Sequence, residues 1–211
     1  MSTPAIYSRK EDIANALSHG VGIFLGIIGL IFLLIFAVKK NNPYEFAGYL
    51  IFGLSIIILY SSSTIYHLAQ DKKLKEKLRI LDHTSIFLLI AGSYTPFTLT
   101  VLKGTWGWSI LITIWTIAIL GIVLKLFYTG KYNFLSTMLY LFMGWIVIIA
   151  IVPLLKNLNH NGFLLLLIGG LFYSIGIIFY LWKKLPFNHF IWHLFVLSGT
   201  ICQYFSVLLY T

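Results

Sequence analysis

Residues 17–38 read LSHGVGIFLGIIGLIFLLIFAV, a run without a single aspartate, glutamate, lysine or arginine. A helix needs roughly 20 mostly apolar residues to cross the hydrocarbon core of a bilayer, so this run is long enough to span a membrane. It is too long for the apolar part of a cleaved signal peptide, and no small-residue cleavage site follows it. We therefore interpret it as a span that is retained in the mature protein.

Six further apolar runs follow, separated by short segments rich in charge, proline, glycine and asparagine. The seven predicted spans are residues 17–38, 46–67, 80–102, 106–128, 134–155, 163–182 and 189–210. Backbone groups in hydrocarbon must hydrogen-bond internally, and the alternation typical of barrel strands is absent, so each run is predicted to be helical. We expect an all-α integral membrane protein, with residues 1–211 forming one bundle of seven transmembrane helices in the cell membrane.

The composition agrees with a chain that lies almost wholly in the membrane. Hydrophobic residues make up 59% of the 211 residues and charged residues only 10%, whereas a soluble domain carries about 25% charged residues. The formal net charge of +9 is expected to serve topology and attraction to anionic inner-leaflet lipids. A chain this apolar has no solvated face for a duplex, so we expect no nucleic-acid partner. The single cysteine, Cys202, excludes an internal disulfide.

Lysine and arginine predict the orientation, because cytoplasmic loops of membrane proteins carry an excess of both. With the N-terminus in the cytoplasm and seven spans, eleven basic residues fall inside and four outside. The inside set is Arg9, Lys10, Lys72, Lys73, Lys75, Lys77, Arg79, Lys125, Lys131, Lys183 and Lys184, and the outside set is Lys39, Lys40, Lys103 and Lys156. We therefore predict a cytoplasmic N-terminus and an external C-terminus.

Ionisable side chains within spans are costly and mark candidate functional sites. The predicted topology brings five of them to the cytoplasmic end of the bundle, although they come from three separate spans. They are His67 at the end of the second span, Asp82 and His83 near the start of the third, and His189 and His193 at the start of the seventh.

The spacing of the histidines indicates a metal site. His189 and His193 stand four residues apart, so their rings share one helical face, as in helical zinc sites. His67 supplies a third imidazole from a neighbouring span. Three histidines with an open fourth position are typical of a catalytic rather than a structural zinc site. The alternative is that these histidines lie half hydrated at the membrane interface without a ligand role.

Two further residues complete the candidate catalytic set. Ser63 lies four residues before His67 on the same face and can reach a second-shell or water position. Asp82 can ligate the metal, orient an imidazole, or hold and deprotonate a metal-bound water. We interpret His83, about 100° away from Asp82 around the helix, as a packing or hydrogen-bonding residue. His160 is expected to be solvated in an outer loop, and His19 to be either second-shell or interfacial.

A stripe of small residues at Gly22, Gly26 and Gly29 lets helices approach closely. It can serve a homo-oligomer or, as we favour, packing within the bundle. Pro96 is expected to kink the third span.

Five segments together resemble the hemolysin III family, in order and over nearly the whole chain. They are NALSH at 15–19, STIYH at 63–67, RILDH at 79–83, AGSYTPF at 91–97 and HFIWHLF at 189–195. This family is the bacterial branch related to the progestin and adipoQ receptors and, more distantly, to the alkaline ceramidases. The resemblance implies a seven-helix bundle whose zinc ion, near the cytoplasmic face, is held by residues matching His67, His189 and His193. Residues matching Ser63 and Asp82 would lie close to its water. Many bacterial relatives carry a further histidine where this chain has Gln203.

Three functions compete at this point. The first is a zinc-dependent hydrolase acting on the amide or ester bond of a membrane lipid, in the manner of a ceramidase. The second is a receptor-like regulator of membrane lipid state in which the zinc is structural. The third is an oligomeric pore-forming cytolysin, although seven hydrophobic spans favour a resident protein over a secreted toxin.

Overall fold

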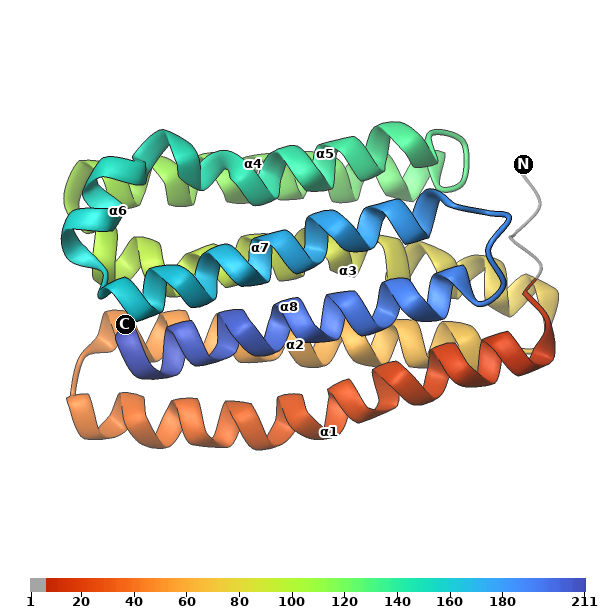
Figure 1. Cartoon of the computed structure of the whole chain (residues 1–211), viewed down its shortest axis with the longest axis horizontal. Coiled ribbons are helices and arrows are strands. Elements are labelled where there is room, and N and C mark those ends of the chain that lie inside the picture. The colour runs from red at the N-terminus through yellow and green to blue at the C-terminus, as the bar shows by residue number, and fades with distance from the viewer. Residues whose placement is uncertain (1–6) are drawn as a thin grey trace.

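Seven helices that are long and apolar enough to cross a bilayer run side by side in the structure (Figure 1). The structure is a computed structural model that describes residues 7–211. Residues 1–6, the start of the predicted cytoplasmic segment and of the predicted domain, lie outside the described residues. The predicted all-α fold and the multi-pass membrane location are confirmed, and no strand occurs between residues 7 and 211.

The helices follow the predicted spans in order. They are α1 (Arg9–Lys40), α2 (Pro43–Leu68), α3 (Lys72–Phe97) with a π-helical turn (Thr98–Leu102), α4 (Gly104–Tyr128), α5 (Asn133–Trp145), a 3₁₀ turn (Ile146–Ala150), α6 (Ile151–Asn157), α7 (His160–Leu181) and α8 (Asn188–Tyr210). The fifth span is formed by α5, the 3₁₀ turn and α6 together.

Two helices begin earlier than the apolar runs suggest, because polar residues cap them. Ser8 and Glu11 form a reciprocal capping box at the start of α1. The Asp71 side chain accepts the Leu74 N–H at 2.8 Å and begins α3 inside the charged segment that we expected to be a loop. Hydropathy marks the part of a helix that meets hydrocarbon, whereas the caps set where the helix begins.

The third and fifth spans are irregular. The regular part of α3 ends one residue after Pro96 and continues as the π-helical turn, and the kink expected at Pro96 stays a prediction. The fifth span changes to a 3₁₀ turn at Ile146, and the Tyr94 hydroxyl hydrogen-bonds to backbone groups on both sides of this change. It lies 2.8 Å from the Met143 carbonyl and accepts the Val147 N–H at 3.0 Å. The irregular backbone is therefore satisfied by protein, as hydrocarbon requires.

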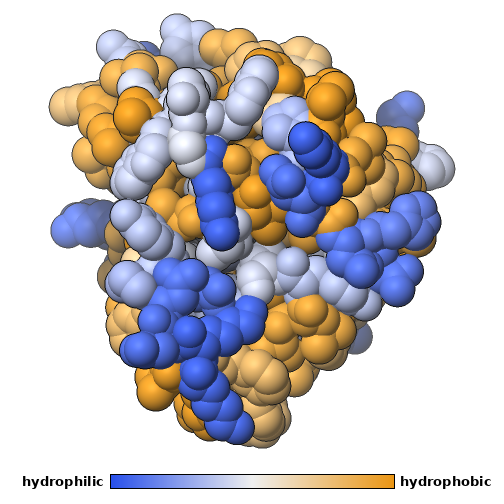
Figure 2. Space-filling view, turned by 90° about the vertical axis from the view of Figure 1, so that its left-hand side faces the viewer, coloured by the Kyte–Doolittle hydropathy of each residue, from blue (hydrophilic) through white to orange (hydrophobic). Residues whose placement is uncertain are grey.

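The two ends of the bundle differ. One end holds the start of α1, the end of α2 and the start of α8, and we call it the histidine end because His67 and His189 lie there. Figure 2 looks onto the opposite end, where hydrophilic residues gather on an otherwise hydrophobic surface. Exposed polar residues at the helix ends and loops of that end include Lys39, Lys40, Asn41, Lys103, Lys156 and Asn157.

The predicted small-residue stripe packs inside the chain. A Cβ atom built on Gly22 would lie 2.7 Å from the Tyr60 ring of α2, and one on Gly29 would lie 2.8 Å from the Tyr204 ring of α8. Gly26 meets Ile56 of α2 in the same way, at 2.9 Å. The stripe therefore lets α1 lie close to both α2 and α8, and a role in a homo-oligomer stays untested.

This close approach predicts that Gly22→Ala destabilises the protein. Overpacking a well-packed core typically lowers the free energy of unfolding by about 1–3 kcal/mol, and we expect a loss of this size. Tyr60 is fully buried and cannot retreat easily. Gly20→Ala is the matched control, because nothing lies within 4 Å of its added Cβ, and alanine favours a helix by about 1 kcal/mol. Thermal unfolding in detergent should show a lower Tm for Gly22→Ala and an equal or higher Tm for Gly20→Ala. Equal Tm values for the two variants would contradict the packing.

Candidate metal centre

Three buried imidazoles meet at the histidine end of the bundle. His67 comes from the last turn of α2, and His189 and His193 come from the first two turns of α8. One ring nitrogen from each lies within 4.8 Å of the others, and the exposed fractions are 0%, 9% and 2%. The structure thus brings together the three histidines that the spacing predicted, in an arrangement that can hold one metal ion.

The free nitrogens of this cluster fit a metal. His67 Nε2 and His189 Nδ1 are buried and have no hydrogen-bond partner within residues 7–211. Buried polar atoms in folded proteins are nearly always paired, so two unpaired nitrogens within one cluster indicate a ligand. Neutral imidazole nitrogens are common ligands of zinc and other transition metals. The donor set therefore fits a metal ion, without deciding which.

The other nitrogen of His67 is held by α1. His67 Nδ1 lies 2.9 Å from a carboxylate oxygen of Asp12, and the Lys75 ammonium lies 2.5 Å from the second oxygen of the same carboxylate. A metal-ligating histidine commonly donates its second N–H to a carboxylate, which fixes the tautomer and the ring orientation. Asp12 leaves His67 Nε2 as the free lone pair, which points to the centre of the cluster.

His193 is oriented by α1 in the same way. Its Nδ1 lies 3.2 Å from the Asn15 carbonyl and 3.1 Å from the Ser18 hydroxyl. An N–H donated to the carbonyl leaves Nε2 unprotonated. The buried His19 ring stacks on His193 with a centroid distance of 3.5 Å and an angle of 8° between the planes. Of the two roles open to His19, the structure favours support of the cluster over a place at the interface.

Among the residues of α1, His19 was a candidate from the sequence, whereas the contributions of Asp12 and Asn15 were not predicted. Asp12, Asn15 and His19 recur at intervals of three and four residues, so they share one helical face. That spacing is the signal that could have revealed a polar face directed into the bundle.

Aromatic rings cover the cluster toward the end of the bundle. The Tyr7 ring stacks on His189 at 4.9 Å, and Tyr180 of α7 lies at 5.8 Å from the same imidazole. Burial of the Tyr7 phenol raises its pKa above the usual value, so this group stays neutral over the physiological range. The cover limits the access of bulk water to the histidines.

Both candidate catalytic residues lie beside the cluster. Ser63 and Asp82 line one cavity together with His189 and His193. Ser63 is 1% exposed and its hydroxyl lies beside the Asp82 carboxylate, which is near enough to His67 for their charges to interact. The cavity wall thus combines a carboxylate, a hydroxyl and two of the three histidines.

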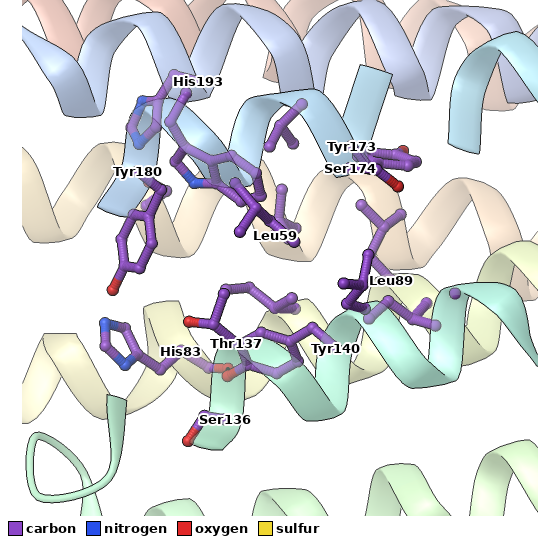
Figure 3. Close-up of a pocket in the computed structure, with 18 of the residues that line it drawn as sticks. Leu59, His83, Leu89, Ser136, Thr137, Tyr140, Tyr173, Ser174, Tyr180 and His193 are labelled. Carbon is purple, nitrogen blue, oxygen red and sulfur yellow. Dashed lines mark hydrogen bonds between the residues drawn. The ribbon is translucent and has the colours of Figure 1, made fainter. Parts of the chain in front are cut away.

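The cavity is long, and its middle part is apolar. Figure 3 shows His193, Tyr180 and His83 at one end of it, Leu59 in the middle, and Leu89, Tyr173 and Ser174 toward the other end. Its walls come mainly from α3, α5, α7 and α8. His189 and Gln203 of α8 both line it, and a helix rises about 1.5 Å per residue, so the cavity follows α8 for about 20 Å.

The polar groups at the far end of the cavity are paired with one another, with one exception. The Tyr173 hydroxyl lies 2.9 Å from Thr200 Oγ1, and the Trp145 indole N–H donates to Ser174 at 3.0 Å. Gln203 also reaches the cavity, and its side-chain oxygen has no partner in the described chain.

The remaining residues singled out from the sequence lie outside the three-histidine cluster. His83, interpreted from the sequence as a packing or hydrogen-bonding residue, lines the same cavity as Asp82. His160 is exposed as predicted, although it begins α7 instead of lying in a loop. Cys202 is a free cysteine outside the histidine cluster.

Comparison with known proteins decides the family. A protein-family model described as "Haemolysin-III related" matches residues 7–204. The chain belongs to the haemolysin-III family. It is 49% identical to a "Hemolysin-3 homolog" of Bacillus subtilis over 97% of this chain and 96% of the relative. It is also 49% identical to a "Hemolysin-3" of Bacillus cereus, over 95% of this chain and 92% of the relative.

A more distant relative comes from animals. The human "Monocyte to macrophage differentiation factor" is 29% identical over 93% of this chain and 83% of its own length. The haemolysin-III resemblance seen in the five sequence segments is thus confirmed over nearly the whole chain. These names describe the relatives and assign no activity to this protein.

The Asp12–His67 pair predicts that Asp12→Asn weakens metal binding by about 10–100-fold, the usual loss for a partner that orients a ligand. Asparagine keeps the size but loses the charge that holds the His67 tautomer. Metal affinity measured by competition with a chelator should show this loss. Glu76→Gln removes the same charge from an exposed position on α3 and should leave the affinity unchanged. An Asp12→Asn protein with wild-type affinity would exclude the orienting role.

Proposed function

We propose that this protein is a zinc-dependent membrane hydrolase that cleaves an amide or ester bond of a lipid. The observation that carries the proposal is that His189 and His193 of the three-histidine cluster line an elongated apolar cavity together with Asp82 and Ser63. A ligand site with a few convergent polar groups at one end of an apolar pocket is typical of enzymes with apolar substrates.

Zinc is the metal that this donor set favours. His67, His189 and His193 would hold it, and no carboxylate or cysteine joins them in the cluster found within residues 7–211. Three protein ligands with an open position are typical of catalytic zinc. When bound, zinc lowers the pKa of a water molecule to about 7 and polarises a carbonyl oxygen.

The side chains of the protein itself supply the remaining steps. Asp82 accepts the proton of the attacking water at a carboxylate oxygen and returns it to the leaving amine or alcohol. Ser63 places its hydroxyl beside Asp82, where it can orient that water or the scissile carbonyl. The acyl tail lies along the apolar part of the cavity, and Tyr7 shields the reacting groups from bulk water.

The excess of lysine and arginine at the histidine end favours catalysis at the cytoplasmic face. Exposed lysines of the segments around α3 and α8 would attract anionic lipids of the inner leaflet, among them Lys72, Lys73, Lys183 and Lys184.

A receptor-like regulator with structural zinc is the second candidate, because the cluster and its partners tie α1, α2 and α8 together. A pore-forming cytolysin, suggested by the name of the Bacillus cereus relative, is the third. It is less favoured, because the exposed apolar side chains along α1 and α4 suit lipid contact by a resident monomer.

The zinc assignment predicts about one zinc per purified wild-type chain by elemental analysis. The double variant His67→Ala/His193→Ala should contain no stoichiometric zinc and should unfold at a lower temperature, because metal binding contributes to folding free energy. His160→Ala, at an exposed position outside the cluster, should keep both properties. Full zinc occupancy in the double variant would refute the site.

The hydrolase assignment predicts that Asp82→Asn folds and keeps its zinc but loses lipid cleavage about a hundredfold or more, because asparagine cannot accept the proton. Release of fatty acid from ceramides and phospholipids in mixed micelles measures this loss. Glu76→Gln again serves as the charge-matched control. A zinc-loaded wild type that cleaves none of these lipids, together with a wild-type cellular phenotype for Asp82→Asn, would favour the receptor instead.

A further inference from the structure

A buried lysine lines the cavity without an acidic partner. Lys125, in the last turn of α4, is 4% exposed and its side chain forms part of the cavity wall. The ion pairs found in residues 7–211 involve Lys40, Lys75 and His67, not Lys125. Arg79 of α3 is also buried, at 8% exposure, and forms no ion pair in that range.

The acidic residues of the chain account for this lack of partners. There are six of them, and all lie within the described range. Five are engaged or exposed elsewhere, namely Glu11 and Asp71 in helix caps, Asp12 with His67 and Lys75, Glu45 with Lys40, and Glu76 at the surface. The sixth, Asp82, interacts with the charges of Arg79 and His67. No carboxylate is left for Lys125.

Further basic groups surround Lys125. The charges of Lys125 and Arg79 act on each other and on the imidazole of His83, which also lines the cavity. Asn133, at the start of α5, adds a buried side-chain oxygen that is unpaired in the described chain. The hydrogen bond from the Tyr140 hydroxyl to the His83 carbonyl, at 2.9 Å, holds α5 against α3 at this point.

An unpaired buried cation is unfavourable unless something compensates its charge. Lysines near helix ends often extend along the helix and place their charge in the interface. At 4% exposure, Lys125 does not place its charge in the interface in this way. Lys131, in the next loop, is exposed and solvated by contrast. The charge of Lys125 therefore faces the interior of the cavity and favours an anion there.

We propose that Lys125, with the charge of Arg79 nearby and the imidazole of His83 as a further polar contact, forms a cationic subsite that binds the anionic oxygens of a single-chain lipid. The tail of this lipid would lie in the apolar middle of the cavity, between Leu59 and Leu89 (Figure 3). The anionic group is either a carboxylate, as in a fatty acid, or a phosphate, as in a lysophospholipid. The inference rests on the lipid-binding part of the proposed function but needs neither zinc nor hydrolysis.

The subsite also selects against positive charge. A long-chain amine bound at this subsite would meet the positive charges of Lys125 and Arg79, so it is disfavoured there, and anionic chains are retained. If the protein cleaves lipid amides, the acyl fragment would remain bound while the amine fragment leaves.

Direct binding tests the subsite on the full-length protein in detergent. Hexadecanoate, hexadecyl phosphate, hexadecanol and hexadecylamine are compared by isothermal titration on wild type, Lys125→Met and Lys131→Met. Lys125→Met keeps the length of the side chain and removes its charge. A hydrogen-bonded charge contributes on the order of tenfold to a hundredfold in affinity, so Lys125→Met should lose that factor for the anions and nothing for hexadecanol. Lys131→Met should bind all four as wild type does, and Lys125→Arg should restore anion binding.

The ratio of the binding affinities for the two anions identifies the chemical class of the ligand. Stronger binding of hexadecanoate points to a fatty acid, and stronger binding of hexadecyl phosphate points to a lysophospholipid. The proposal is overturned if Lys125→Met binds the anions as tightly as wild type does. It is also overturned if the variant loses affinity for hexadecanol by the same factor as for the anions. Charge-dependent binding in a protein that cleaves no lipid would leave the subsite standing while the hydrolase assignment falls.

Chemical protection of wild type gives a second measurement that does not depend on how Lys125→Met folds. Reductive methylation with formaldehyde, followed by mass spectrometry, reports the reactivity of each lysine. Saturating hexadecyl phosphate should slow the modification of Lys125 and leave that of exposed Lys131 unchanged. Equal rates for Lys125 with and without the lipid would contradict the subsite.

Discussion

A bilayer offers no water to backbone or side-chain polar groups, and most of this structure follows from that constraint. It requires helices, and it also requires every polar side chain inside the bundle to find a partner or a ligand. Tyr94 satisfies the backbone where the fifth span changes its helix type. Asp12 and Asn15 satisfy one nitrogen each of His67 and His193. Several of the atoms left unpaired in the described chain, among them those of His19, His189 and Gln203, belong to residues that line one cavity, and the candidate site lies there.

Much of this arrangement could be predicted from the sequence, because two strong signals carry it. Hydropathy located the seven spans, and the alternation of their direction placed the end of α2 beside the start of α8. The spacing of His189 and His193 then required both rings to share a face. That these two residues lie close to His67 follows from the number and the alternating direction of the spans, and the structure confirms it.

The partners of these residues could not be predicted, because they depend on how each helix is rotated about its axis. Contacts such as Gly22 against Tyr60 set the rotation of α1, and that rotation directs Asp12 toward His67. Hydropathy carries little information on rotation in α1, where most of the surface is apolar. Lys125 shows the same limit. In the sequence, Lys125 counted only as one of the cytoplasmic basic residues. In the structure, it is buried where α4 meets the cavity, beside His83 of α3.

The histidine cluster and its partners join the first helix to the last, and this has a consequence for biosynthesis. His67 and Asp12 enter the membrane early, whereas His189 and His193 emerge from the ribosome only after six spans have been made. A metal ion with three protein ligands can therefore be captured only by a completed and closed bundle. Metal capture would mark the end of assembly, and truncated chains, which expose unpaired histidines and an open polar face of α1, would be recognisable to quality-control proteases.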